Sequence, residues 1–174
     1  MNLILLAGES LSNRDWIEQV EAKLRPYFEA TNIQYYKHWK QKDAHINIDR
    51  ELGVLAKSIE RFDNYIVFAK SAGTVVTLKG VYEGLITPKK SVFLGMPLKW
   101  MRSNSFPLGS WIFRYRIPTM FIQKERDPQA SYQELSELIK GCALSDYQAF
   151  KLPGEDHNYE DLEQIETLVR EFIK

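Results

Sequence analysis

The stretch YIVFAKSAG, residues 65–73, carries the clearest strand signal in the chain and runs directly into an apolar helical segment, residues 74–83. The continuous apolar run 65–69 is typical of a strand that is buried on both faces of a parallel sheet. Ser71 therefore falls in the turn between a buried strand and a buried helix. The small residues Ala69 and Gly73 suit a turn in which the two backbones nearly touch.

The rest of the sequence continues this alternation of strands and helices. Further strands are predicted at residues 3–7, 33–36, 91–94, 119–123 and 147–152. Helices are predicted to begin near Ser12, to cover 49–61 and 131–140, and to run from about Asn158 to the end. Ser12 with Asp15, and Ser131 with Glu134, have the spacing of a capping box. The pattern predicts one domain over residues 1–174, a three-layer α/β/α sandwich with a mainly parallel six-stranded sheet.

Composition excludes several classes of function. Lys plus Arg and Asp plus Glu both number 23 in 174 residues, so the formal net charge is zero. This gives no electrostatic reason to expect nucleic acid or an anionic membrane as a partner. No apolar run approaches the roughly 20 residues that span a bilayer, and the short apolar start is interpreted as a strand rather than a signal peptide. The single cysteine, Cys142, fits a reducing compartment, so we expect a cytoplasmic protein.

Reactive side chains follow three of the predicted strands. Ser71 comes after the third strand, Asp127 after the fifth and His157 after the sixth. Ligands of parallel α/β sheets bind beyond the carboxyl ends of the strands, so these side chains are candidates for one site. A histidine can take the serine proton and return it later, while an aspartate orients the imidazole. The structural alternatives are a packing turn, a helix cap and a surface loop, and Glu125 is an alternative acid.

The segment 69–73, Ala-Lys-Ser-Ala-Gly, resembles the nucleophile elbow of the α/β-hydrolases, with Ala69 in place of the usual first glycine. The order Ser, Asp, His along the chain also matches that family. The resemblance covers nearly the whole chain and is closest to small single-domain serine hydrolases of the retinoblastoma-binding-protein or dienelactone-hydrolase-like type. It implies a truncated α/β-hydrolase fold with strand order 2-1-3-4-5-6. It also implies hydrolysis of a small carboxylic ester or thioester through an acyl-enzyme intermediate, without a cofactor.

The resemblance also assigns the groups that would stabilise a negative intermediate. The backbone N–H of Ala72 would be one oxyanion donor, because it lies at the start of a helix. The second donor is expected from the backbone at Glu9 or Ser10, in the loop after the first strand. This loop lacks the usual His-Gly pair, and the Glu9 carboxylate would oppose an anionic intermediate if it pointed into the site. Lys70 could stabilise an anionic group of the substrate or reach solvent, and we expect it to reach solvent.

The segment 96–117 between the fourth and fifth strands is rich in aromatic and basic residues. Three interpretations are open, and the weakest is that nucleic acid bases stack on this aromatic and basic patch. In one, the segment is a short cap, and Met96, Trp100 and Trp111 wall an apolar acyl pocket. In another, it is a helix–loop segment that packs on the sheet, with its basic groups in solvent.

Two other classes of function stay open at this point. One is a non-catalytic binding protein on the same scaffold, which the unusual first loop and the aromatic segment would favour. The other is a flavodoxin-like or nucleotide-binding protein, in which His157 would have no role. No metal cluster or phosphate-binding glycine motif is recognised, so no metal or cofactor is expected. The expected partner is a small-molecule substrate, His38 and His45 are not expected to be catalytic, and no signal indicates an oligomeric state.

Overall fold

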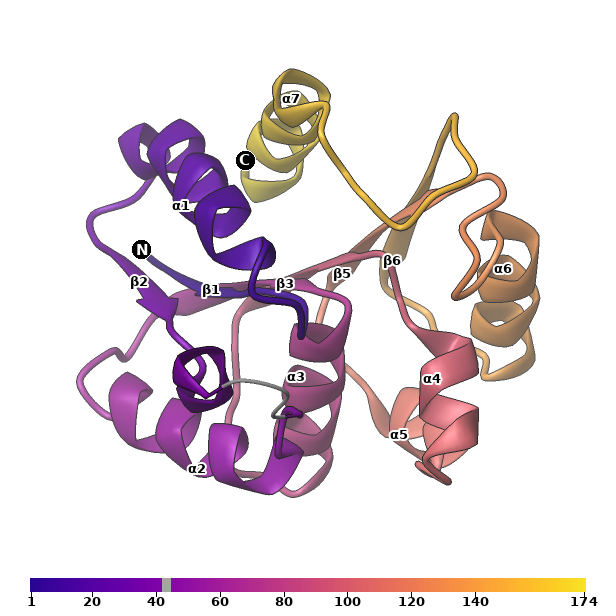
Figure 1. Ribbon diagram of the computed structural model, residues 1–174, viewed down its shortest axis with the longest axis horizontal. Helices are drawn as coiled ribbons and strands as arrows, with labels where there is room; N and C mark the ends of the chain where they lie inside the picture. The colour runs from indigo at the N-terminus through magenta and orange to yellow at the C-terminus, as the bar shows by residue number, and fades with distance from the viewer. Residues whose placement is uncertain (42–44) are drawn as a thin grey trace.

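The computed structural model describes residues 1–41 and 45–174 and contains one six-stranded sheet between two layers of helices (Figure 1). The strands are β1 (Asn2–Leu6), β2 (Thr31–Gln34), β3 (Tyr65–Lys70), β4 (Lys90–Leu94), β5 (Thr119–Lys124) and β6 (Tyr147–Leu152). Their order is β2-β1-β3-β4-β5-β6, and every neighbouring pair is parallel. The fold class and the strand order implied by the sequence are therefore confirmed.

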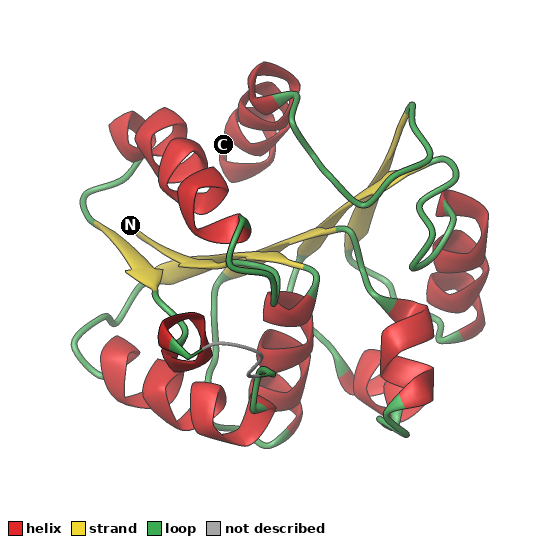
Figure 2. Cartoon of the chain, viewed as in Figure 1, coloured by secondary structure: helices red, strands yellow, loops and turns green. Residues whose placement is uncertain are grey.

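Helices cover both faces of this sheet (Figure 2). They are α1 (Asn13–Leu24), α2 (Ile48–Ile59), α3 (Ala72–Tyr82), α4 (Leu98–Ser103), α5 (Leu108–Arg114), α6 (Tyr132–Gly141) and α7 (Leu162–Ile173). Helices α1 and α7 lie on one face, and α2 to α6 lie on the other. Short 3₁₀ turns follow α1 at Arg25–Tyr27 and β2 at Lys37–Lys40. Within the described residues, no helix is both long enough and apolar enough to cross a bilayer.

The continuous apolar runs of the sequence form the four inner strands, β1, β3, β4 and β5, because these strands are buried on both faces. In β1, Leu3 and Leu5 pack into the cluster with α1 and α7, whereas Ile4 and Leu6 pack into the cluster with α2 and α3. All four side chains have no solvent exposure. Side chains alternate between the two faces of a strand, so burying both faces requires apolar residues at every position.

The start of the last helix differs from the sequence prediction. Helix α7 begins at Leu162 rather than near Asn158. Asp161 caps it, because its Oδ1 atom accepts the backbone N–H of Gln164 at 3.0 Å. Residues 153–161 instead form an extended loop after β6, and this loop carries His157.

One of the two predicted capping boxes forms. The Ser131 hydroxyl oxygen accepts the Glu134 backbone N–H, and the Glu134 carboxylate accepts the Ser131 backbone N–H at 2.8 Å. The box predicted at Ser12 and Asp15 is wrong. Ser12 has helical dihedral angles, and its hydroxyl lies 2.9 Å from the Ser10 hydroxyl instead.

A core substitution tests the doubly buried sheet. Leu5→Ala removes a fully buried side chain from a central strand and should lower the free energy of unfolding by about 2–5 kcal/mol. Leu85→Ala makes the same change at a side chain that is 51% exposed, and should change the free energy of unfolding by no more than about 0.5 kcal/mol. Urea unfolding of both variants measures the difference, and equal losses would contradict this arrangement of the core.

Candidate active site

Ser71 occupies a strained turn between β3 and α3. Its φ of 49° and ψ of −117° lie in a region that residues with a side chain rarely adopt. The turn is held by hydrogen bonds on both sides of the serine. The Ser71 N–H donates to the Leu94 carbonyl at 3.0 Å, and the Thr74 N–H and hydroxyl donate to the Ser71 carbonyl. Such strain persists where the surrounding structure enforces it, and it is common at functional sites.

Gly73 lets the turn approach the end of β1. A Cβ atom at this position would lie 2.8 Å from both the Cβ and the carbonyl oxygen of Leu6. The Gly73 N–H instead donates to the Ala7 carbonyl at 3.1 Å. The sequence predicts a small residue at this position, and the direct contact between the two backbones explains why one is needed.

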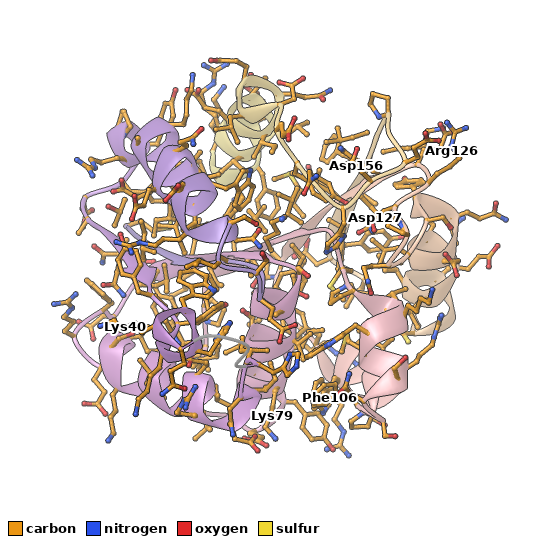
Figure 3. All side chains as sticks on the ribbon, viewed as in Figure 1. Lys40, Lys79, Phe106, Arg126, Asp127 and Asp156 are labelled. Atoms are coloured by element: carbon orange, nitrogen blue, oxygen red, sulfur yellow. The ribbon has the colours of Figure 1, made fainter. Side chains whose placement is uncertain are left out.

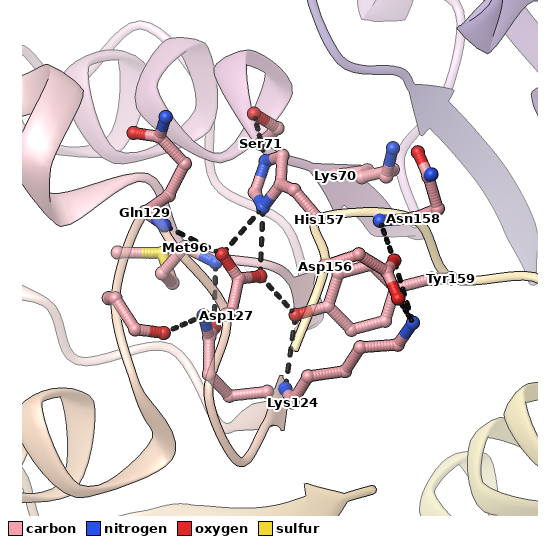
Figure 4. A network of polar contacts seen from close by, with 12 residues as sticks. Lys70, Ser71, Met96, Lys124, Asp127, Gln129, Asp156, His157, Asn158 and Tyr159 are labelled. Carbon is pink, nitrogen blue, oxygen red and sulfur yellow. Dashed lines mark hydrogen bonds and ion pairs between the residues drawn. The ribbon is translucent and has the colours of Figure 1, made fainter. Parts of the chain in front are cut away.

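The structure brings Ser71, His157 and Asp127 together in one hydrogen-bonded chain (Figure 4). His157 Nε2 lies 2.9 Å from Ser71 Oγ, and His157 Nδ1 lies 2.8 and 2.9 Å from the two Asp127 carboxylate oxygens. Because a carboxylate accepts, Nδ1 carries the hydrogen and the Nε2 lone pair faces the serine hydroxyl. The chain can therefore pass a proton from the serine to the imidazole.

Asp127 is turned inward, whereas its neighbour Arg126 extends to the surface (Figure 3). The Tyr159 hydroxyl donates to Asp127 Oδ2 at 2.8 Å, and the Gln129 backbone N–H donates to Oδ1 at 2.8 Å. Burial, reinforced by the Asp127 carboxylate, raises the pKa of Tyr159 well above its usual value, so the phenol stays a donor. The alternative acid Glu125 lies outside this network and pairs with Lys151 at 3.1 Å.

Gly95 makes room for the two rings of the site. It follows β4 with a φ of +61°, and a Cβ atom there would lie 2.8 Å from Tyr159 Cε2 and 3.1 Å from His157 Cε1. Sequence reasoning missed both Gly95 and Tyr159. A glycine directly after a buried strand is a signal that could have drawn attention to Gly95.

The three residues considered as oxyanion donors border one pocket. Ala72, Glu9 and Ser10 line a cavity of about 200 Å³ together with Ser71 and His157. Across residues 1–41 and 45–174, the backbone N–H groups of these three residues have no protein acceptor. The Glu9 carboxylate is engaged elsewhere, because its Oε1 atom accepts the backbone N–H of residue 46 at 3.0 Å and lies 3.1 Å from the ring of His45.

Lys70 does not reach solvent, so that prediction is wrong. Its side chain is 5% exposed, its Nζ donates to Asn13 Oδ1 at 2.6 Å, and it lies 5.0 Å from the centre of the Trp16 ring. Burial lowers the pKa of Lys70 to about 8, although the charge of Asp127 opposes this shift. Asn13 also donates to the Ser10 carbonyl at 3.1 Å, so a buried ammonium is linked to the loop after β1.

The segment 96–117 forms α4 and α5, and buried residues of both helices belong to the hydrophobic core on one face of the sheet. Trp100 lines the pocket together with Pro97 and Gln129. Met96 and Trp111 lie in the hydrophobic core and not at the pocket, with 0% and 4% exposure. The pocket wall is therefore more polar than the sequence suggested.

Other reactive groups show no sign of a second chemical site. Cys142 is half-buried, and burial raises the pKa of its thiol. In the part of the chain that the structure describes, no cluster of His, Cys, Asp or Glu could hold a metal ion.

The burial of Lys70 predicts a change in stability with pH. Its pKa is about 8 in the folded chain and has its ordinary value of 10.5 when exposed, so the unfolded chain holds more protons between these pH values. The contribution of Lys70 to the free energy of unfolding should therefore rise with pH in this window, by up to about 1.4 kcal/mol per unit. Urea unfolding of wild type and Lys70→Met from pH 7.5 to 10 measures this contribution. The control is Lys89→Met, which removes the ammonium of an exposed lysine. A constant difference between wild type and Lys70→Met would contradict the burial.

Comparison with known proteins supports the fold. Neither a protein-family model nor a curated protein sequence matches this chain. Among solved structures, it is similar to alpha/beta hydrolase domain-containing protein 10 from mouse, with a TM-score of 0.75, 11% identity, and coverage of 99% of this chain and 89% of that one. It is also similar to Est1E from Butyrivibrio proteoclasticus with ferulic acid bound, with a TM-score of 0.76, 14% identity, and coverage of 99% of this chain and 87% of that one. An esterase from Pyrococcus furiosus has a TM-score of 0.75 and 15% identity, with coverage of 99% of this chain and 81% of that one. The chain therefore has the fold of the α/β-hydrolases, the family that its sequence resembles.

Proposed function

We propose that this protein is a serine hydrolase that cleaves a small carboxylic ester or thioester. The observation that carries the proposal is the chain of short contacts from Ser71 Oγ through the His157 ring to the buried Asp127 carboxylate. The chain opens onto a pocket that also contains backbone N–H groups without protein acceptors in the described residues. A nucleophile, a base and oxyanion donors are thus available to a single carbonyl group.

The first half of the reaction forms an acyl-enzyme. Ser71 Oγ attacks the substrate carbonyl carbon while His157 Nε2 takes the serine proton, and Asp127 stabilises the imidazolium. The negative charge moves to the carbonyl oxygen, where the N–H groups of Ala72 and of Glu9 or Ser10 donate to it. His157 then gives its proton to the leaving alcohol or thiol as the bond to the carbonyl carbon breaks.

The second half regenerates the serine. Water attacks the acyl carbonyl carbon while His157 takes one of its protons, and the same N–H groups stabilise the second oxyanion. Collapse of this intermediate breaks the bond to Ser71 Oγ, which receives the proton from His157. The carboxylic acid product leaves, and no cofactor takes part in the balance of atoms and electrons.

The pocket supports a small and polar substrate. Its volume is about 200 Å³, and Glu9, Asn13, Lys70 and Gln129 contribute to its lining. A long apolar chain would leave such groups unpaired, which costs free energy.

Two further points support this assignment. The Pyrococcus furiosus protein is an esterase by name, Est1E was solved with ferulic acid bound, and both share the fold. The zero net charge and the single cysteine support a cytoplasmic protein that acts on a small molecule rather than on nucleic acid or a membrane.

Active-site labelling tests the nucleophile. A fluorophosphonate probe should label wild type, because the probe reacts with a serine that a neighbouring imidazole activates. Ser71→Ala should abolish labelling, whereas Ser103→Ala, at an exposed serine on α4, should leave it unchanged. Fluorescence of the labelled band after electrophoresis is the measurement. Unchanged labelling of Ser71→Ala would remove this serine as the nucleophile, and an unlabelled, inactive but folded wild type would favour a binding protein.

Acyl-chain length tests the pocket. The value of kcat/KM for p-nitrophenyl acetate or butyrate should exceed that for the decanoate by about tenfold or more, because the pocket is small and polar side chains contribute to its lining. Initial rates below the critical micelle concentration of the decanoate give the ratio. A preference for the decanoate would contradict the proposed substrate class.

A further inference from the structure

Side chains that follow β2 hold the loop that follows β1. Both His38 Nε2 and Trp39 Nε1 lie 2.7 Å from the backbone carbonyl oxygen of Glu9. The Tyr36 hydroxyl donates to the carbonyl of Ala7 at 2.8 Å. We call Tyr36, His38 and Trp39 the aromatic clamp. Its three donors all act on carbonyl groups of the segment that leads from β1 into the proposed oxyanion loop.

The clamp is a packed unit rather than a set of surface contacts. Tyr36 and His38 are 1% and 3% exposed, and their rings stack with centroids 5.6 Å apart. The Trp39 ring lies 4.9 Å from the Tyr36 ring. Side chains held in this way keep their hydrogen-bonding atoms fixed, so little freedom remains to be lost when substrate binds.

The protonation of His38 follows from its partner. A carbonyl oxygen can only accept, so Nε2 carries the hydrogen. The other ring nitrogen, Nδ1, is buried without a partner among the described residues. A buried unpaired nitrogen destabilises the fold, and an apolar side chain could fill the same space without this cost. Packing alone therefore does not explain why a histidine, with its Nε2–H directed at the Glu9 carbonyl, occupies this position.

The two donors fix the peptide between Glu9 and Ser10. The peptide is trans, so the N–H of Ser10 points opposite to the clamped carbonyl of Glu9. The next carbonyl, that of Ser10, is also held, because the side-chain and backbone N–H groups of Asn13 donate to it at 3.1 and 2.9 Å. With the carbonyls on both sides of it held, Ser10 keeps its backbone N–H in a fixed orientation beside Ser71 in the pocket.

We propose that His38 and Trp39 are positioning residues that hold the Glu9–Ser10 backbone in place to donate to the oxyanion. The proposal rests on the hydrolase function given above. Neither side chain lines the pocket, so both act through the backbone of Glu9 and touch no reacting atom. A preorganised donor stabilises the transition state more than it stabilises the bound substrate. Loss of the clamp should therefore lower kcat more than it changes KM.

Paired variants of the clamp test this role. His38→Leu and Trp39→Phe each remove one donor while keeping an apolar side chain in place. Each should lower kcat for p-nitrophenyl acetate by about tenfold or more, short of the roughly 100- to 1000-fold effect of deleting an oxyanion donor, while KM changes by less than about threefold. His38→Gln places an amide N–H near the position of Nε2 and should restore kcat to within about threefold of wild type. Steady-state kinetics of folded proteins gives these values.

Two controls separate positioning from general destabilisation. Leu55→Ala removes a fully buried side chain of α2 and should lower stability while leaving kcat near the wild-type value. A trifluoromethyl ketone that matches the acyl group forms an oxyanion on the serine, so its inhibition constant should rise in the clamp variants by the factor by which kcat/KM falls. A merely structural role would not produce this parallel change.

The outcomes are distinguishable. If wild type is not labelled at Ser71 and has no esterase activity, the proposed function fails and this inference fails with it. If wild type is active but His38→Leu and Trp39→Phe keep kcat within about twofold, the clamp has no positioning role and the proposed function stands. Equal losses in His38→Gln and His38→Leu would also overturn the inference, because the donor would then not be the property that matters.

Discussion

The backbone contact between Gly73 and the end of β1 is the constraint on which the rest of the site depends. At this contact the Gly73 N–H reaches the Ala7 carbonyl, and no side chain could be placed between the two segments. The contact places the turn that carries Ser71 directly beside the loop that carries Glu9 and Ser10. Two backbone segments that are more than 60 residues apart in sequence therefore border a single pocket, and oxyanion donors can come from both.

Buried neighbours on both sides stabilise this strained geometry. The dihedral angles of Ser71 cost on the order of 1–3 kcal/mol, and the fully buried strands β1 and β3 supply apolar burial that offsets this cost. On the other side of the serine, the absence of a side chain at Gly95 leaves space for the rings of His157 and Tyr159. Ser71 is thus positioned by β1 and β3, and His157 is positioned by β4, β5 and the loop after β6.

The sequence predicts the sheet and the three reactive positions because both depend on local patterns. Strands buried on both faces need unbroken apolar runs, and a parallel sheet gathers whatever follows its strands at one edge.

The burial of Lys70 could not be predicted, because lysine is rarely buried and its partners Asn13 and Trp16 are far away in sequence. The same holds for Tyr159, whose partner Asp127 lies 32 residues earlier, and for the aromatic clamp, which acts across about 30 residues. Met96 and Trp111 were expected at the pocket because aromatic and thioether side chains suit an apolar wall, but the same property draws them into the core.

The charges around the pocket explain how a glutamate can be accommodated in the proposed oxyanion loop. The carboxylate of Glu9 accepts a hydrogen bond from a backbone N–H of the segment before α2, and this bond stabilises its negative charge. Ala72, whose backbone N–H lies at the positive end of the α3 dipole, lines the pocket, and the ammonium of Lys70 is buried nearby. Electrostatic interactions are stronger in a partly buried pocket than in water, so these positive groups favour negative charge on a carbonyl next to Ser71. The Lys70–Asn13–Ser10 chain and the aromatic clamp thus act on the same loop from two sides, one adding positive charge and the other fixing the backbone.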